Sequence, residues 1–100
     1  MMQAFALPAD VSGDRAAELL PALRRQIDAV RSGSMTVDAA GVQRFDSASL
    51  ALLLECRRLL QARKAKLELL HAPAGLVSMA QVYGVHELLG MPAAAALSDA

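Results

Sequence analysis

A chain of 100 residues can form one domain with a single core, and its composition is 55% apolar but only 3% aromatic, so Leu, Ala and Val must provide most of the packing. Ten basic and ten acidic residues give zero formal net charge, which argues against nucleic acid or a membrane surface as a direct partner. A single cysteine, Cys56, excludes an internal disulfide. With no membrane-spanning run and no signal-peptide pattern, we expect a cytoplasmic protein with a free buried thiol.

The first third of the chain predicts a strand, a helix and a second strand. Gln3 to Leu7 is a short apolar strand candidate, and Arg15 to Arg31 carries apolar residues at helical spacing. We expect Pro21 in the first turn of the regular part of this helix, because an interior proline removes a hydrogen bond. Met35 to Val37 reads as a short buried strand.

The rest of the chain continues the alternation. A very apolar helix is predicted from Ser47 to Lys64, a strand from Leu67 to Leu70 and a helix from Leu76 to Tyr83. We expect one domain over residues 1–90 and a flexible tail over 91–100. Alternating strands and helices predict an α/β fold, here a small mixed sheet of three to four strands with helices packed mainly on one face.

Two polar residues precede the apolar helix. Asp46 and Ser47 are both good N-cap residues, because a side-chain oxygen can accept from the free N–H groups of the first turn. The positive end of the helix dipole also tolerates an anion there, including a phosphate on Ser47. A plain helix cap and a regulatory switch are both compatible with this pattern.

The faces of this helix are unequal. Its core stripe is expected to contain Ser49, Leu52, Leu53, Cys56, Leu59 and Leu60. Leu50 and Leu54 fall outside the stripe, on the side of Arg58 and close to Ser47. Either a second layer covers both leucines, or they form an exposed apolar patch that a partner covers. We take their position beside the polar cap to favour the interface.

The residues typical of catalysis and metal binding are scattered. His71 and His86 have no metal-ligand spacing, and no glycine-rich phosphate loop is present. No sequence pattern places a histidine near Ser47 to act as a base for a nucleophile, and Asp38 and Asp46 offer only weak evidence for a carboxylate pair. We therefore expect no enzyme activity, no cofactor and no metal.

Taken together, residues Gln3 to Leu89 resemble a STAS domain, the module of anti-sigma factor antagonists and of the cytoplasmic ends of sulfate transporters. The most specific part is Val37-Asp38 followed by Val42 to Leu53. In that family an aspartate precedes a serine or threonine at the start of a helix, and that hydroxyl is the phosphorylation switch where a partner kinase exists. Asp46 and Ser47 match these two positions.

Within the family, the chain is most similar to the STAS subunits of bacterial ABC transporters that maintain the lipid asymmetry of the outer membrane. The similar segments are Leu19-Leu20-Pro21, Leu50 to Leu54 and Leu76 to Val85. The resemblance implies a non-catalytic protein that binds the transporter's ATPase subunit on the cytoplasmic face of the inner membrane. Contact with the membrane would then be indirect, through that partner.

The sequence departs from the family pattern in two places. Ser49 stands where family members often carry glycine. Family members also usually have a strand before the one expected at Gln3 to Leu7. An absent strand would leave an open sheet edge, which could pair with a second copy of the chain.

The resemblance and the helix pattern together predict a partner-binding surface. Its residues are Asp46, Ser47, Leu50, Ala51, Leu54, Arg58 and Tyr83. The first alternative is an anti-sigma factor antagonist that uses the same surface on a kinase that phosphorylates Ser47. A small enzyme using Asp38, Asp46 and Ser47 and a generic self-associating domain are the others. The basic run from Arg63 to Lys66 reads first as a solvated helix end, and second as a contact for an acidic partner or a lipid headgroup.

Overall fold

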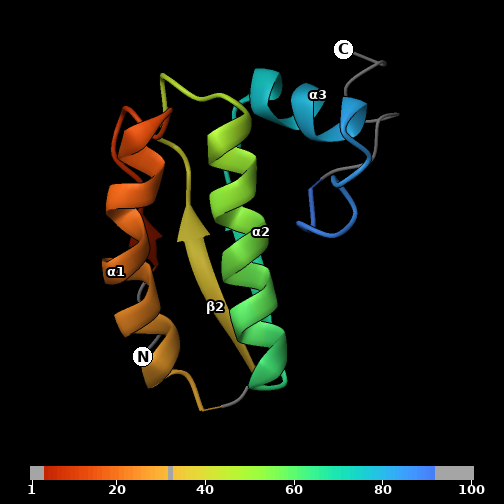
Figure 1. Ribbon diagram of the computed structural model, residues 1–100. Coiled ribbons are helices and arrows are strands. Elements are labelled where there is room, and N and C mark those ends of the chain that lie inside the picture. The colour runs from red at the N-terminus through yellow and green to blue at the C-terminus, as the bar shows by residue number, and fades with distance from the viewer. Residues whose placement is uncertain (1–3, 32, 92–100) are drawn as a thin grey trace.

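The computed structural model describes residues 4–31 and 33–91. Strands and helices alternate through the whole described chain, as the sequence predicts (Figure 1). In chain order the elements are β1 (Phe5–Ala6), α1 (Asp14–Ala29), β2 (Gly33–Asp38), α2 (Ser47–Ala62), β3 (Ala65–Leu70) and α3 (Ala74–Val82).

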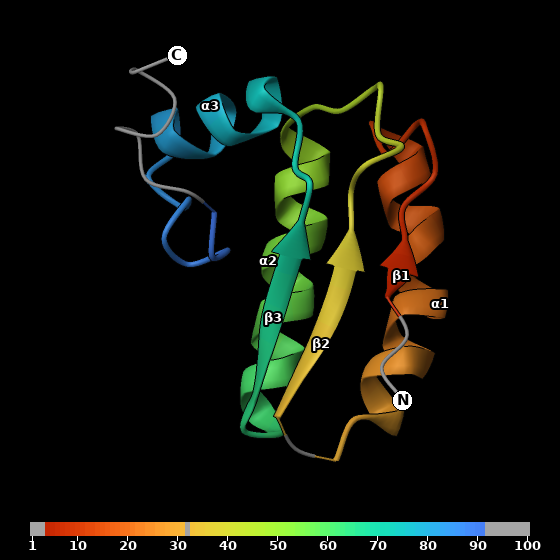
Figure 2. The same cartoon turned by 180° about the vertical axis from the view of Figure 1, so that it is seen from behind.

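The three strands form one parallel sheet in the order β1-β2-β3. Val37 at the centre is level with Phe5 of β1 and with Leu69 of β3. Helices α1 and α2 lie side by side on one face, whereas α3 lies beyond the end of the sheet at which the strands finish (Figures 1 and 2). This confirms an α/β fold with three strands and helices mainly on one face, although the described sheet is wholly parallel and not mixed.

The two faces of the sheet differ in polarity because successive side chains point to opposite sides of a strand. Met35 and Val37 are buried on the helix side. On the other face, Thr36 Oγ1 donates to Glu68 Oε1 at 3.3 Å, and Lys66 is exposed. No described helix covers that face (Figure 2). Lys66 and Glu68 are exposed there, and so, at 42%, is the apolar side chain of Leu70, which follows the same alternation along β3.

The core is aliphatic and continuous between the sheet and the helices. Leu23 and Ile27 of α1 and Leu53, Cys56 and Leu60 of α2 are at most 2% exposed. Each fully buried side chain of this size contributes about 1.5–3 kcal/mol relative to exposure. The predicted stripe of α2 is therefore confirmed, although Leu59 is only partly buried.

Pro21 corrects one prediction, because it lies in the interior of α1 and not in its first turn. The proline is exposed, and so is Ala17, the residue whose carbonyl loses its helical hydrogen bond. Water can therefore reach that carbonyl, which lowers the cost of the missing bond. The burial of apolar residues at helical spacing on both sides of Pro21 outweighs the preference of proline for the first turn of a helix.

The segment after α3 turns back toward the sheet. Leu89 and Met91 are buried, at 0% and 7% exposed. Met91, which we expected to begin a flexible tail, therefore belongs to the packed domain. The rest of the expected tail, residues 92–100, and Gln3 of the expected first strand lie outside the described residues. Among the described residues, no helix is both long and apolar enough to cross a bilayer.

Candidate partner-binding site

Asp46 joins the starts of the two long helices. Its Oδ1 accepts from the backbone N–H of Ala48 at 2.9 Å, which caps α2 as predicted. Its Oδ2 accepts from the backbone N–H of Gly13 at 3.0 Å, immediately before α1. Both carboxylate oxygens therefore accept hydrogen bonds inside the domain, which gives Asp46 a positioning role at the site.

Ser49 is the buried polar centre of this arrangement, at 2% exposed. Its hydroxyl donates to the carbonyl of Val11 at 2.6 Å and accepts from the N–H of Asp46 at 3.1 Å. The spacing of Asp46 and Ser49 is that of a capping box. From the sequence we treated Ser49 only as a substitute for glycine. The spacing from Asp46 was the signal that could have revealed its role.

Ser47 is the first residue of α2, and its side chain faces solvent. Ala51 is exposed one turn later, and Arg58 is exposed farther along the helix. At about 100° per residue, Ser47, Ala51, Leu54 and Arg58 fall within about 60° around the helix axis. They form a continuous stripe, as the sequence predicts for all four.

Leu50 does not belong to this stripe, because it is only 2% exposed. It lies in the same core cluster as Leu76 and Val77 of α3, and α3 lies beside the start of α2 (Figure 1). The prediction of an exposed patch is therefore wrong at Leu50, which is buried in the core. Leu54 is partly buried against the core, and Tyr83, at the end of α3, is 59% exposed.

A shallow apolar groove of about 270 Å³ separates the first halves of α1 and α2. Its lining consists of Gly13, Ala16, Ala17, Leu20, Ala48, Ala51, Leu52 and Glu55. Small side chains from both helices create the hollow. From the sequence only Ala51 was predicted at this site, because the contribution of α1 depends on which helices become neighbours.

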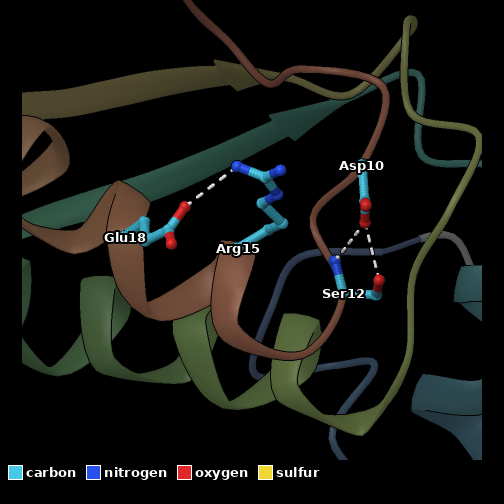
Figure 3. Close-up of polar contacts among 4 residues, drawn as sticks. All are labelled: Asp10, Ser12, Arg15 and Glu18. Carbon is cyan, nitrogen blue, oxygen red and sulfur yellow. Dashed lines mark hydrogen bonds and ion pairs between the residues drawn. The ribbon is translucent and has the colours of Figure 1, made fainter.

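The turn that leads into α1 contributes Gly13 to the lining of the groove, and Figure 3 shows the polar contacts made by its neighbours. Asp10 Oδ1 accepts from the backbone N–H of Ser12 at 3.0 Å and from its hydroxyl at 2.6 Å. These hydrogen bonds, with a smaller effect of two nearby arginines, lower the pKa of Asp10. Arg15 forms an exposed ion pair with Glu18 at 3.2 Å. The two hydrogen bonds between Asp10 and Ser12 hold the chain entering Gly13, whose φ of 52° is left-handed.

Comparison with protein families supports the resemblance seen in the sequence. The family described as "Mlab, STAS domain" matches residues 6–90. The chain belongs to this MlaB-type STAS family. No curated protein and no solved structure matches it.

STAS domains are generally non-catalytic, and the two carboxylates considered for catalysis, Asp38 and Asp46, have other partners here. Asp38 Oδ1 lies 3.0 Å from Nδ1 of His71 and 2.9 Å from the N–H of Ala40. The hydrogen bond from His71 is the main reason why the pKa of Asp38 is lowered. Asp46 is bonded to Gly13 and Ala48 instead, so the described contacts do not include the Asp38–Asp46 pair.

The STAS domain offers little for a metal or a reactive thiol. Among residues 4–31 and 33–91, no three His, Cys, Asp or Glu side chains gather closely enough to hold a metal ion. Burial raises the pKa of Cys56 to about 11, which keeps its thiol protonated at neutral pH. The accessible features of the site are therefore the α2 stripe and the adjoining groove.

Proposed function

We propose that this STAS domain is a non-catalytic subunit that binds the ATPase subunit of an inner-membrane ABC transporter for phospholipid. It supports the assembly and activity of that ATPase and so contributes to outer-membrane lipid asymmetry. It resides in the cytoplasm, at the inner membrane through its partner. Membership of the MlaB-type family supports this role.

The observation that carries the proposal is the continuous stripe of Ser47, Ala51 and Leu54 beside the α1–α2 groove. The stripe offers a hydroxyl and apolar surface, and the groove can accept a small apolar side chain from the partner. Arg58 extends the stripe, but Glu55 already holds its guanidinium at 2.6 and 2.9 Å. Tyr83 supplies a further exposed aromatic ring at the end of α3.

Binding should be sensitive to charge and bulk at the stripe. Ser47→Asp places a carboxylate in a surface that becomes desolvated on docking, and Ala51→Arg fills the edge of the groove. We expect each change to weaken the complex by at least about tenfold, while leaving the fold intact because both side chains are exposed.

The test is co-expression with the ABC ATPase encoded nearest this protein, purification through a tag on this chain, and native mass measurement. Ala62→Arg is the matched control, because Ala62 is an exposed alanine about 16 Å farther along α2. A stable complex that Ala51→Arg loses and Ala62→Arg retains supports the proposal. A complex that survives both Ser47→Asp and Ala51→Arg contradicts this interface, and failure to form any complex contradicts the transporter role.

The exposure of Ser47 also favours a second candidate, an anti-sigma factor antagonist switched by phosphorylation. A phosphate on this hydroxyl would lie in solvent at the positive end of α2. Incubation with ATP and the candidate kinase, followed by mass measurement, distinguishes the two roles. A phosphate added to wild type and absent from Ser47→Ala would support the antagonist.

A further inference from the structure

The zero net charge of the chain conceals a separation of charge along the molecule. Eight of the ten basic residues lie where α1 and α2 end and where β2 and β3 begin, a region we call the basic end. These residues are Arg24, Arg25, Arg31, Arg57, Arg58, Arg63, Lys64 and Lys66. Since a helix rises 1.5 Å per residue, those within the helices lie within about 8 Å of the helix ends.

The acidic residues of the same region do not cancel this charge. They are Asp28, Glu55, Glu68 and Glu87, which leaves the basic end with a formal charge of +4. The remaining described charges, at the opposite end, are Arg15 and Arg44 against Asp10, Asp14, Glu18, Asp38 and Asp46, a formal charge of −3. The molecule therefore carries a charge dipole along the direction of its helices.

Some of the basic side chains have roles within the fold. Arg63 donates to the carbonyls of Val30 and Asp28 at 3.0 and 2.9 Å, which satisfies the end of α1. Arg58 is paired with Glu55. The carbonyl ends of the two parallel helices together carry a partial negative charge, which offsets about one unit of the positive charge at this end.

Five basic side chains remain available to solvent. They are exposed and form no ion pair within the described part of the chain: Arg24, Arg25, Arg31, Lys64 and Lys66. Lys64 lies at the tip of the tight turn from α2 to β3, with a left-handed φ of 59°. The fold therefore presents several unpaired cations at one extremity.

An exposed leucine beside the basic residues indicates what kind of partner this end fits. Leu88, 46% exposed, lines a pocket of about 280 Å³ together with Arg57, Lys66 and Glu87. Protein interfaces usually have an apolar centre depleted of charge, whereas here one leucine adjoins many cations. Cations with an adjacent leucine suit the phosphate headgroups and outer acyl region of a lipid bilayer.

We propose that the basic end binds the surface of an anionic phospholipid membrane directly. This goes beyond the proposed function, in which the membrane is reached only through the ATPase, and it does not depend on that function. Ser47, at the start of the stripe, lies about 22 Å from the last residue of α2, whereas Arg58 belongs to both surfaces. Membrane binding at the basic end therefore leaves the Ser47 and Ala51 part of the stripe accessible.

The test is flotation of the purified full chain with vesicles of phosphatidylcholine alone or with 30 mol% phosphatidylglycerol, at low and high salt. Anionic lipid should raise the bound fraction at low salt, and added salt should lower it because screening shortens the range of attraction. The double variant Arg31→Glu with Lys64→Glu should weaken binding at least about tenfold, because each basic residue near an anionic surface raises the membrane affinity severalfold.

The matched control is Arg15→Glu with Arg44→Glu, which changes the net charge equally but at the opposite end. We expect the control to bind more tightly than the basic-end variant, with circular dichroism showing both to be folded. Equal loss in the two double variants would mean that only net charge matters and would overturn the proposal. Equal binding to neutral and anionic vesicles would overturn it too. Polyglutamate serves as a model of an acidic protein partner, and binding to polyglutamate but to neither vesicle would also overturn the proposal.

Discussion

The free backbone groups at the two ends of α1 and α2 find their partners in different ways. At the start of α1 and α2, Asp46 and Ser49 satisfy free N–H and carbonyl groups from within, and the surface left over is small and apolar. At the end of the same helices, Arg63 satisfies carbonyls while several other cations remain free. Because α1 and α2 run parallel on one face, their dipoles add, and each end collects compensating charge. Parallel packing of the two helices thus places basic residues at one end of the molecule and acidic residues at the other.

The largest expected effect concerns the buried leucine at the first end. Leu50→Ala should destabilise the domain by about 2–5 kcal/mol, because it removes a fully buried side chain and leaves a cavity. Leu54→Ala is the comparison, and since Leu54 is only partly buried its cost should be clearly smaller. Urea denaturation of both variants measures the difference. Equal, small losses would contradict the burial of Leu50 in the core.

A smaller effect is expected from the buried hydroxyl that connects the helix starts. Ser49→Ala should cost about 1–3 kcal/mol, because the carbonyl of Val11 and the N–H of Asp46 lose their partner away from water. The control is Ser47→Ala, which removes an exposed hydroxyl on the same turn and should change stability by under about 0.5 kcal/mol. If thermal unfolding shows the two variants alike, Ser49 is not the polar centre of this end.

At the opposite end, Arg63→Ala should cost about 1 kcal/mol or less. Its hydrogen bonds to α1 are lost, but the two carbonyls can bond to water because this region is exposed. Arg25→Ala, an exposed arginine with no ion pair among the described residues, is the control and should be neutral. A cost at Arg25 as large as that at Arg63 would show that the basic end stabilises the fold through its charge and not through capping.

The smallest effect concerns Cys56, which lies between the two ends. Burial holds its pKa at about 11 in the folded protein, above an ordinary value of 9.0. The stability this provides is complete below pH 9 and is lost as the pH rises toward 11, because the unfolded chain releases the thiol proton more readily. Urea midpoints at pH 8 and pH 10 should therefore diverge more for wild type than for Cys56→Ala. The same divergence in both proteins would mean that Cys56 does not contribute.

Short-range patterns predicted much of the candidate site. The cap at Asp46, the exposed stripe of Ser47, Ala51 and Arg58, and the buried face of α2 all follow from spacing within one helix. The burial of Leu50 did not, because it depends on how the start of α2 packs against the rest of the core. The position of Pro21 was missed for a related reason, since its cost depends on whether water reaches the carbonyl of Ala17.

The sequence by itself determined the alternation of strands and helices, the family and the zero net charge, because periodicity, motif and composition are carried by the chain alone. Only the tertiary structure decided that α1 contributes half of the apolar groove and that Asp46 reaches Gly13. It also decided that eight basic residues, spread from position 24 to position 66, gather at one end. The physical reason is the parallel sheet, which forces each connecting helix to run in the same direction and brings like ends together.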